Sequence, residues 1–141
     1  MPYRDRIEIS FDAGHRLLNY QGKCSSPHGH TFRAEVVVGG DSLNAIGLLL
    51  DFGDIKRTLK AWIDDNWDHG FLLNSDDHAL VSALRTIAEA KIYEFPSTNP
   101  SAEAMARSLY CVAERQLGEM LHSIRVWEST TQYAEYGHGG D

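Results

Sequence analysis

The sequence lacks the features that mark exported and membrane-spanning proteins. Its 141 residues include only two cysteines, Cys24 and Cys111, which allow at most one disulfide, and we expect both to be free thiols. The longest apolar run, residues 45–50, is far shorter than the roughly 20 residues that span a bilayer. No hydrophobic signal core follows Met1. We therefore expect a cytoplasmic protein with no membrane partner.

Positive charge is also scarce. Thirteen Lys and Arg residues against twenty Asp and Glu residues give a net charge of -7, which argues against a basic face for nucleic acid. An anionic ligand would need a few local cations. The 43% hydrophobic and 23% charged residues are typical of a folded globular protein. At roughly 150 residues per domain, the length predicts one domain over residues 1–141. Its glycine-rich end, 137–141, is expected to be a flexible tail in which His138 is solvated.

The hydrophobic pattern predicts strands at both ends of the chain and helices between them. Alternation at residues 7–12 and 31–38 is typical of half-buried strands, and residues 124–128 and 132–136 predict two more. Helical spacing predicts one helix that ends near Asn66, a shorter one at 78–90 and a long one from about Ser101 to about His122. This order predicts an α+β fold with a four-stranded sheet. Its edge strands would need a partner, which favours oligomerisation.

Three histidines lie where the first two strands meet. His28 and His30 are two residues apart at the entrance to a strand, so their side chains point to the same side. His15 would join them if the two strands form an antiparallel hairpin. Three neutral imidazoles suit zinc and leave its fourth position open for water or substrate. The alternative is that His28 and His30 are solvated and that His15 is a satisfied polar group near the core, which is the commoner outcome for His-x-His.

Cys24 precedes His28 by four residues. Its thiolate could lie beside a cation or a metal ion, which would make it reactive. The alternative is a small buried residue, which is the interpretation we favour for Cys111 within the last helix.

Two further acidic positions could carry chemistry. Asp68 and His69 follow the first helix, and an adjacent acid and imidazole can supply an oriented base or a proton relay, although most such pairs are surface residues. Glu128 shares a strand face with Val126. Its carboxylate is either an edge-strand charge or a buried acceptor for a ligand with adjacent N–H donors.

Six segments in this order resemble the 6-pyruvoyl-tetrahydropterin synthase and 6-carboxytetrahydropterin synthase family over nearly the whole chain. They are Phe-Asp-Ala-Gly-His-Arg-Leu at 11–17, Gly-Lys-Cys to His-Gly-His at 22–30, Gly47 to Asp-Phe-Gly-Asp-Ile-Lys at 51–56, Asp-His at 68–69, Asn-Pro-Ser-Ala-Glu at 99–103 and Val-Trp-Glu at 126–128. One such match could arise by chance, whereas six in sequence are specific.

The resemblance implies a fold and an assembly. The tunnelling fold (T-fold) of this family is an antiparallel four-stranded sheet with two long helices on one face. Its subunits join edge to edge into a trimeric barrel, and two trimers stack into a homo-hexamer with active sites at the subunit interfaces. Such an assembly would cover the edge strands expected above.

The resemblance also implies a role for each candidate residue. His15, His28 and His30 would be the metal ligands for zinc, and Cys24 would be the catalytic base. Asp68 and His69 of a neighbouring subunit would form the proton relay. Glu128 would anchor the pterin ring. The implied substrate is 7,8-dihydroneopterin triphosphate, which loses triphosphate. The carboxy-forming branch, relevant to queuosine, also loses acetaldehyde, whereas the pyruvoyl-forming branch retains the carbon chain.

The short Cys-x-x-x-His-Gly-His loop is similar to that of the bacterial 6-carboxytetrahydropterin synthases. We therefore expect a zinc-dependent lyase of that branch. The alternatives are a 6-pyruvoyl-tetrahydropterin synthase and a non-catalytic homologue that binds zinc or pterin. A zinc hydrolase is disfavoured because no metal histidine begins a His-Glu-x-x-His motif.

Three positions depart from the family pattern, and we expect them near the pterin pocket. They are Trp67 in place of the usual leucine, Ser101 in place of threonine and Ala104 in place of asparagine. The triphosphate would need local cations, and the residues flanking the motif supply three candidates: Arg16, Lys23 and Arg33.

Overall fold

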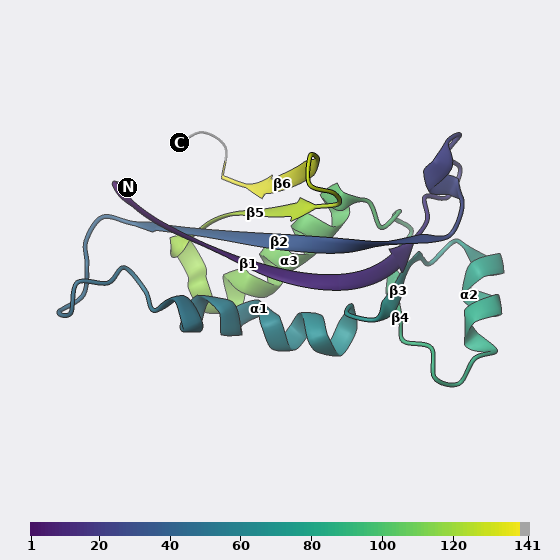
Figure 1. The fold of residues 1–141 in the computed structure, drawn as a ribbon, viewed down its shortest axis with the longest axis horizontal. Coiled ribbons are helices and arrows are strands. Elements are labelled where there is room, and N and C mark those ends of the chain that lie inside the picture. The colour runs from purple at the N-terminus through teal and green to yellow at the C-terminus, as the bar shows by residue number, and fades with distance from the viewer. Residues whose placement is uncertain (139–141) are drawn as a thin grey trace.

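The computed structural model describes residues 1–138, and they form one six-stranded sheet with three α-helices (Figure 1). The strand order is β4-β3-β1-β2-β5-β6. In chain order the elements are β1 Tyr3–His15, β2 His28–Gly40, α1 Phe52–Asn66, β3 Gly70–Asn74, α2 His78–Arg85, β4 Ile92–Phe95, α3 Ala102–Leu117, β5 Leu121–Trp127 and β6 Tyr133–Gly137. Short 3-10 turns occupy Lys23–Ser25 and Gly118–Met120. The predicted α+β class is confirmed.

The expected four-stranded, wholly antiparallel sheet is wrong: the sheet has six strands, and its two additional strands pair in parallel. The four predicted strands are β1, β2, β5 and β6, and they pair antiparallel. The two additional strands, β3 and β4, continue the sheet in parallel beyond β1. They have only five and four residues, too few to give a period-two pattern. Their existence depends on pairing with β1, which is not visible in a local window of sequence.

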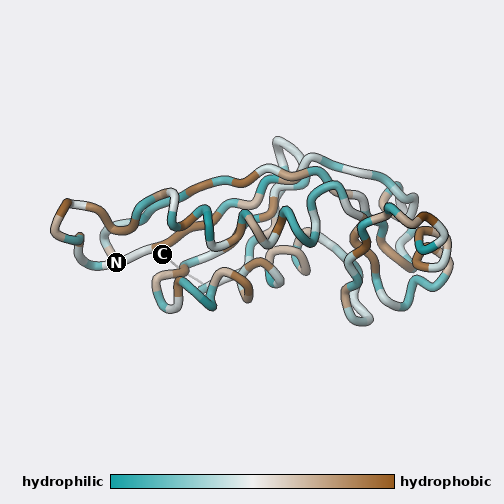
Figure 2. The backbone as a smooth tube through the Cα atoms, turned by 90° about the horizontal axis from the view of Figure 1, so that it is seen from below, coloured by the Kyte–Doolittle hydropathy of each residue, from teal (hydrophilic) through white to brown (hydrophobic). Residues whose placement is uncertain are grey.

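One face of the sheet packs against α1 and α3 to form the core (Figure 1). The hairpin of β1 and β2 supplies this face with alternate residues, such as Phe11 opposite Phe32 and Ile9 opposite Ala34. Figure 2 shows hydrophobic residues recurring along the strands and helices with hydrophilic ones between them. The core therefore follows from the period of two in the strands and 3.6 in the helices.

The last long helix ends earlier than predicted, at Leu117 rather than near His122. Gly118 has a φ of 54°, a left-handed conformation that glycine adopts readily and that stops the helix. A 3-10 turn follows, and β5 begins at Leu121, which places His122 in the strand.

The C-terminal residues of the described part are held in place. Gly137 pairs with Ser123 as the last residue of β6. The His138 N–H donates to the carbonyl of His122 at 3.0 Å, and its Nε2 lies 3.0 Å from the Tyr110 hydroxyl. His138 is thus exposed to solvent and also hydrogen-bonded to the rest of the chain, whereas 139–141 of the predicted tail lie outside the described residues. Within 1–138, no helix combines the length and apolarity that a membrane span requires.

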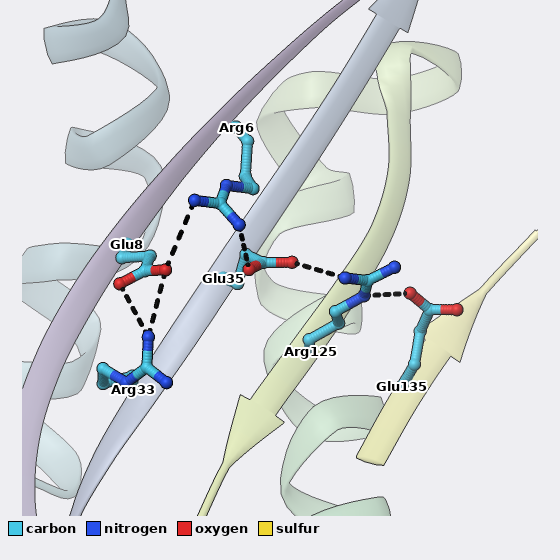
Figure 3. Close-up of polar contacts among 6 residues, drawn as sticks. All are labelled: Arg6, Glu8, Arg33, Glu35, Arg125 and Glu135. Carbon is cyan, nitrogen blue, oxygen red and sulfur yellow. Dashed lines mark hydrogen bonds and ion pairs between the residues drawn. The ribbon is translucent and has the colours of Figure 1, made fainter. Parts of the chain in front are cut away.

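A row of ion pairs crosses the opposite face of the sheet (Figure 3). Its members, across four strands, are Arg33, Glu8, Arg6, Glu35, Arg125 and Glu135. Glu35 is fully buried beneath its partners, with Oε1 at 2.9 Å from Arg6 Nη1 and Oε2 at 3.3 Å from Arg125 Nη1. A carboxylate so buried is tolerable only while its charge is matched.

A second ion pair joins the end of β1 to the start of α2. Arg16 donates two hydrogen bonds to Asp77, one of them from Nε to Oδ2 at 2.5 Å. Asp77 is 2% exposed and also caps α2 by accepting from the Leu80 N–H. The Arg16 guanidinium holds the pKa of this carboxyl below its usual range.

The double substitution Arg6→Ala with Arg125→Ala should reduce the free energy of unfolding by about 3 kcal/mol, because it leaves Glu35 buried and unpaired. Adding Glu35→Gln should recover most of this loss. Urea unfolding measures both, with Arg33→Ala as the control, whose partially exposed partner Glu8 limits the loss to about 0.5 kcal/mol. An equal loss of unfolding free energy in Arg33→Ala and in the double variant would contradict the view that the burial of Glu35 makes its ion pairs important for stability.

Asp77→Asn should lower stability by about 2 kcal/mol at pH 7, because it removes the charge that Arg16 requires. The lowered pKa of Asp77 means that the wild type has this stabilisation above the unfolded-state pKa of about 4 and loses it as the pH falls through the folded-state value. Denaturant unfolding between pH 3 and pH 7 should show the two proteins converging at low pH. A difference independent of pH would refute the charge-based account.

Candidate metal centre and the residues around it

Three histidines converge on the helix-covered side of the sheet at the end of the β1–β2 hairpin. The register places His15 opposite His28 and Ala13 opposite His30, so the three side chains leave the hairpin on the same face. One ligand atom from each histidine lies within 4.8 Å of those of the other two. The ring centroids are 4.7 Å apart for His15 and His28 and 4.8 Å apart for His28 and His30. The group could hold one metal ion.

The Nε2 atom of each histidine has no hydrogen-bond partner within the described residues. The Nδ1 of His15 lies 2.7 Å from the Pro100 carbonyl, and the Nδ1 of His28 lies 2.6 Å from that of Ser26. Because a carbonyl only accepts, these Nδ1 atoms carry the proton and each Nε2 has a free lone pair. The Nε2 atoms of all three histidines, His30 included, are buried with no hydrogen-bond partner among residues 1–138. Buried acceptors normally have partners, and a metal ion would provide one for all three.

The surroundings of His15 and His30 favour the neutral imidazole, the form that binds metal ions. Burial lowers the pKa of His15, against the opposing effects of the Pro100 carbonyl and Glu128. Burial also lowers the pKa of His30, again against the nearby charge of Glu128. Both rings therefore offer lone pairs at neutral pH.

Glu128 lies directly beside this centre. It follows the last residue of β5, and its Oε1 is 3.5 Å from the Nε2 of His30. The carboxylate lines a hollow of about 190 Å³ together with Glu103 and Gln132. It is partially exposed, at 24%, so a ligand in the hollow could reach the carboxylate.

Cys24 lies on the connection between the two ligand-bearing strands. It is the middle residue of the 3-10 turn Lys23–Ser25 and is half-buried. Its carbonyl accepts a hydrogen bond from the Leu17 N–H at 2.7 Å, which holds the turn against the residues that follow β1. The thiol is not one of the three clustered ligand groups. Cys111 is exposed on α3, so the expectation that it is a small buried residue is wrong.

Asp68 and His69 form a pair apart from the three histidines. Asp68 Oδ1 accepts from the Asp12 N–H at 3.0 Å, and its Oδ2 lies 3.0 Å from the Nδ1 of His69. The Asp12 N–H is the main cause that holds the pKa of Asp68 below its usual value, and His69 adds to it. The His69 side chain is 77% exposed, and His69 lines an open hollow of about 450 Å³ whose other lining residues include Asp12, Thr31 and His30. An ionised carboxylate therefore orients an imidazole that faces solvent.

The three cations considered for the triphosphate differ in availability. Arg16 is bonded to Asp77. Arg33 is paired with Glu8 and stacks over the Trp127 ring at 4.6 Å from its centroid. Lys23 is exposed and has no ion pair within the described part of the chain, so it alone of the three is unengaged.

The residues that depart from the family pattern do not surround the hollow at Glu128. Trp67 is fully buried in the core, where it packs against Trp62 and Tyr93. Ala104 lines a separate groove beside Trp62. The Ser101 hydroxyl caps α3 by accepting from the Ala104 N–H at 3.1 Å, a role that threonine could also fill.

Sequence reasoning missed two residues that support the site, Asn99 and Pro100. In the sequence, their Asn-Pro-Ser run indicates a helix start and forms part of a segment that resembles the family, but it assigns no role to these two residues. The carbonyl of Pro100 orients His15, and the Asn99 side chain bonds to the main chain of Leu18. A backbone carbonyl such as that of Pro100 cannot be recognised as a hydrogen-bond acceptor from sequence. The polar side chain of Asn99, two residues before the N-cap Ser101, is the one signal that the sequence offers.

Comparisons with known proteins identify relatives of this chain in sequence and in fold. The family model of 6-pyruvoyl tetrahydropterin synthase matches residues 6–139. The 6-carboxy-5,6,7,8-tetrahydropterin synthase of Rickettsia felis is 39% identical over 101 residues, 72% of each chain. The protein of that name from Haemophilus influenzae is 31% identical over 134 residues, which cover 92% of this chain and 94% of the relative.

Two solved structures share the fold. An uncharacterised protein from Wolinella succinogenes superposes with a TM-score of 0.78 at 18% identity, covering 96% of this chain and 97% of its own. The 6-pyruvoyl tetrahydropterin synthase of Caenorhabditis elegans superposes with a TM-score of 0.72 at 19% identity, covering 97% and 96%. At these identities the likeness concerns the fold alone. The family model and the curated relatives extend the likeness to the sequence itself, and the chain belongs to the 6-pyruvoyl tetrahydropterin synthase family.

Proposed function

We propose that this family member is a zinc-dependent lyase that converts 7,8-dihydroneopterin triphosphate to 6-carboxy-5,6,7,8-tetrahydropterin, with loss of acetaldehyde and triphosphate. The observation that carries the proposal is the group of three unpartnered Nε2 atoms beside the Glu128 carboxylate. The names of the Rickettsia and Haemophilus relatives support the carboxy-forming branch. The short loop between Cys24 and His28 supports it as well.

His15, His28 and His30 would hold the zinc ion. Three neutral imidazoles suit zinc and leave one coordination position for the substrate. When bound, zinc would polarise the side-chain hydroxyls of the substrate and so acidify the adjacent C–H bonds. The hydrogen bond between His15 Nδ1 and the Pro100 carbonyl leaves the Nε2 of His15 free to bind the ion.

Glu128 would anchor the pterin. A 2-amino-4-oxopterin presents two adjacent N–H donors, and one carboxylate can accept both. Since Glu128 Oε1 is 3.5 Å from a ligand histidine, an anchored ring would direct its side chain toward the metal position. Lys23 is the candidate to meet the triphosphate, because Arg16 and Arg33 already have acidic partners.

Cys24 would take the proton from the substrate carbon as a thiolate. The proposal is supported by the place of its turn, on the connection between the two strands that carry the three histidines. The Asp68–His69 pair would relay protons for Cys24 of a neighbouring subunit. This assignment is supported by the exposure of His69, which is not one of the three clustered ligand groups of its own chain.

The relay requires an assembly, and the sheet has the edges for one. β4 and β6 are the outer strands of the described sheet, with one side of each unpaired. Edge-to-edge pairing into trimers and stacking of two trimers into a homo-hexamer would bring active sites to the subunit interfaces. A cytoplasmic location and the absence of a nucleic-acid partner belong to the same proposal, on the grounds of sequence given above.

A second candidate is the pyruvoyl-forming reaction. The structure from Caenorhabditis elegans, which carries that name, shares the fold. The residues proposed for zinc binding and proton transfer would serve either branch. The product is therefore what distinguishes the two.

Purified protein should contain about one zinc ion per chain, measured by elemental analysis after dialysis. His15→Ala should weaken zinc binding by at least about 100-fold, because it removes one of three ligands, a larger change than the loss of an outer hydrogen bond. His69→Ala is the matched control and should retain the metal. Zinc-free wild type, or equal loss from both variants, would contradict the assignment of the ligands.

Incubation with 7,8-dihydroneopterin triphosphate should release acetaldehyde and yield 6-carboxytetrahydropterin. Cys24→Ala should lower turnover by about 10²- to 10⁴-fold, the usual contribution of a proton-transferring group, while zinc is retained. Cys111→Ala, which changes the exposed thiol on α3, should leave the rate unchanged. A pyruvoyl product without acetaldehyde would move the chain to the second branch, and bound pterin without turnover would identify a non-catalytic homologue.

A further inference from the structure

The connection between β1 and β2, residues 16–27, must hold Cys24 in place with little secondary structure of its own. Its only regular element is the three-residue turn Lys23–Ser25. Unlike the strands on either side, the connection has no ladder of backbone hydrogen bonds along it. The placement of the thiol therefore depends on contacts that the connection makes with other parts of the chain.

Asn99 makes such a contact with Leu18, a residue of this connection, by bonding to both its backbone N–H and its carbonyl. Its Oδ1 accepts from the Leu18 N–H at 2.8 Å, and its Nδ2 donates to the Leu18 carbonyl at 2.9 Å. A side-chain amide used in this way replaces the neighbouring strand that Leu18 lacks. The neighbouring Leu17 N–H donates to the Cys24 carbonyl at 2.7 Å. Asn99 is thus two links away from the backbone of the cysteine.

Asn99 is itself fixed in orientation. The Nδ2 of Asn74 donates to the Asn99 Oδ1 at 3.1 Å, and Asn74 is 8% exposed at the end of β3. The next residue, Pro100, is buried and its carbonyl orients His15. A single dipeptide therefore contacts both the connection that carries the thiol, at Leu18, and one of the three clustered histidines, His15.

We propose that Asn99 is a positioning residue that keeps Cys24 at a fixed place relative to the three histidines. The inference rests on the proposed role of Cys24 as the base. Proton transfer from carbon is sensitive to small displacements, and a misplacement of about 1 Å can cost about 100-fold in rate. Binding of the pterin by Glu128 does not involve Leu18, so the effect falls on kcat rather than on KM.

Asn99→Asp tests the proposal with little change in volume. One carboxylate oxygen can still accept from the Leu18 N–H, but the other would face the Leu18 carbonyl, so the donor is replaced by a repulsion. We expect kcat to fall about 10- to 100-fold with KM within about threefold and zinc content unchanged. Thr98→Ala is the matched control, because this neighbouring exposed hydroxyl bonds only to the Pro96 carbonyl, and it should behave as wild type.

A second measurement reads the position of the thiol without turnover. In a Cys111→Ala background, the rate of alkylation by iodoacetamide reports Cys24 alone, and it should rise several-fold in Asn99→Asp and not in Thr98→Ala. This rise should persist even if Cys24 proves not to be the base, so the two failures are distinguishable. The proposal is overturned if Asn99→Asp matches Thr98→Ala in both alkylation and kcat, or if its kcat falls only in proportion to lost zinc.

Discussion

The pairing of β1 with β2 is the constraint on which the rest of the structure depends. Its register runs without interruption from Tyr3 opposite Gly40 to His15 opposite His28. The face that carries Phe11 and Phe32 into the core is the same face that carries the histidines at the end where residues 16–27 join the two strands. The His30 ring lies 5.2 Å from that of Phe32, so the candidate metal centre is a direct continuation of the hydrophobic core. Ligand geometry and core packing share one scaffold.

The supporting contacts come from segments distant in sequence. Pro100 and Asn99 reach back more than eighty positions to His15 and Leu18, and Asp77 joins Arg16 from the start of α2. None of these contacts adds a reactive group. Together they limit the motion of the connection that bears Cys24, which is the least regular part of the site. Regular strands thus fix the three histidines, and side-chain hydrogen bonds hold the connection that carries Cys24.

The parts that the sequence made predictable are those governed by local period. Alternation in residues 7–12 and 31–38 placed the strands on the correct faces, and the two-residue spacing of His28 and His30 then brought both rings to one side. β3 and β4 could not be found in this way, because strands of five and four residues acquire their identity from the neighbour they pair with. Likewise, Arg16 looked like a free cation because Asp77 lies 61 positions away. Trp67 looked like a pocket residue because burial is not local information.

The uninterrupted register has a consequence for how such a chain can change over time. A single-residue insertion or deletion within either long strand would turn every later side chain to the opposite face, moving core residues into solvent and the imidazoles away from one another. A change of length in the connection at residues 16–27 would not have this effect, because these residues are not paired in the sheet. Length variation among related proteins should therefore accumulate between these two strands and be nearly absent from within them.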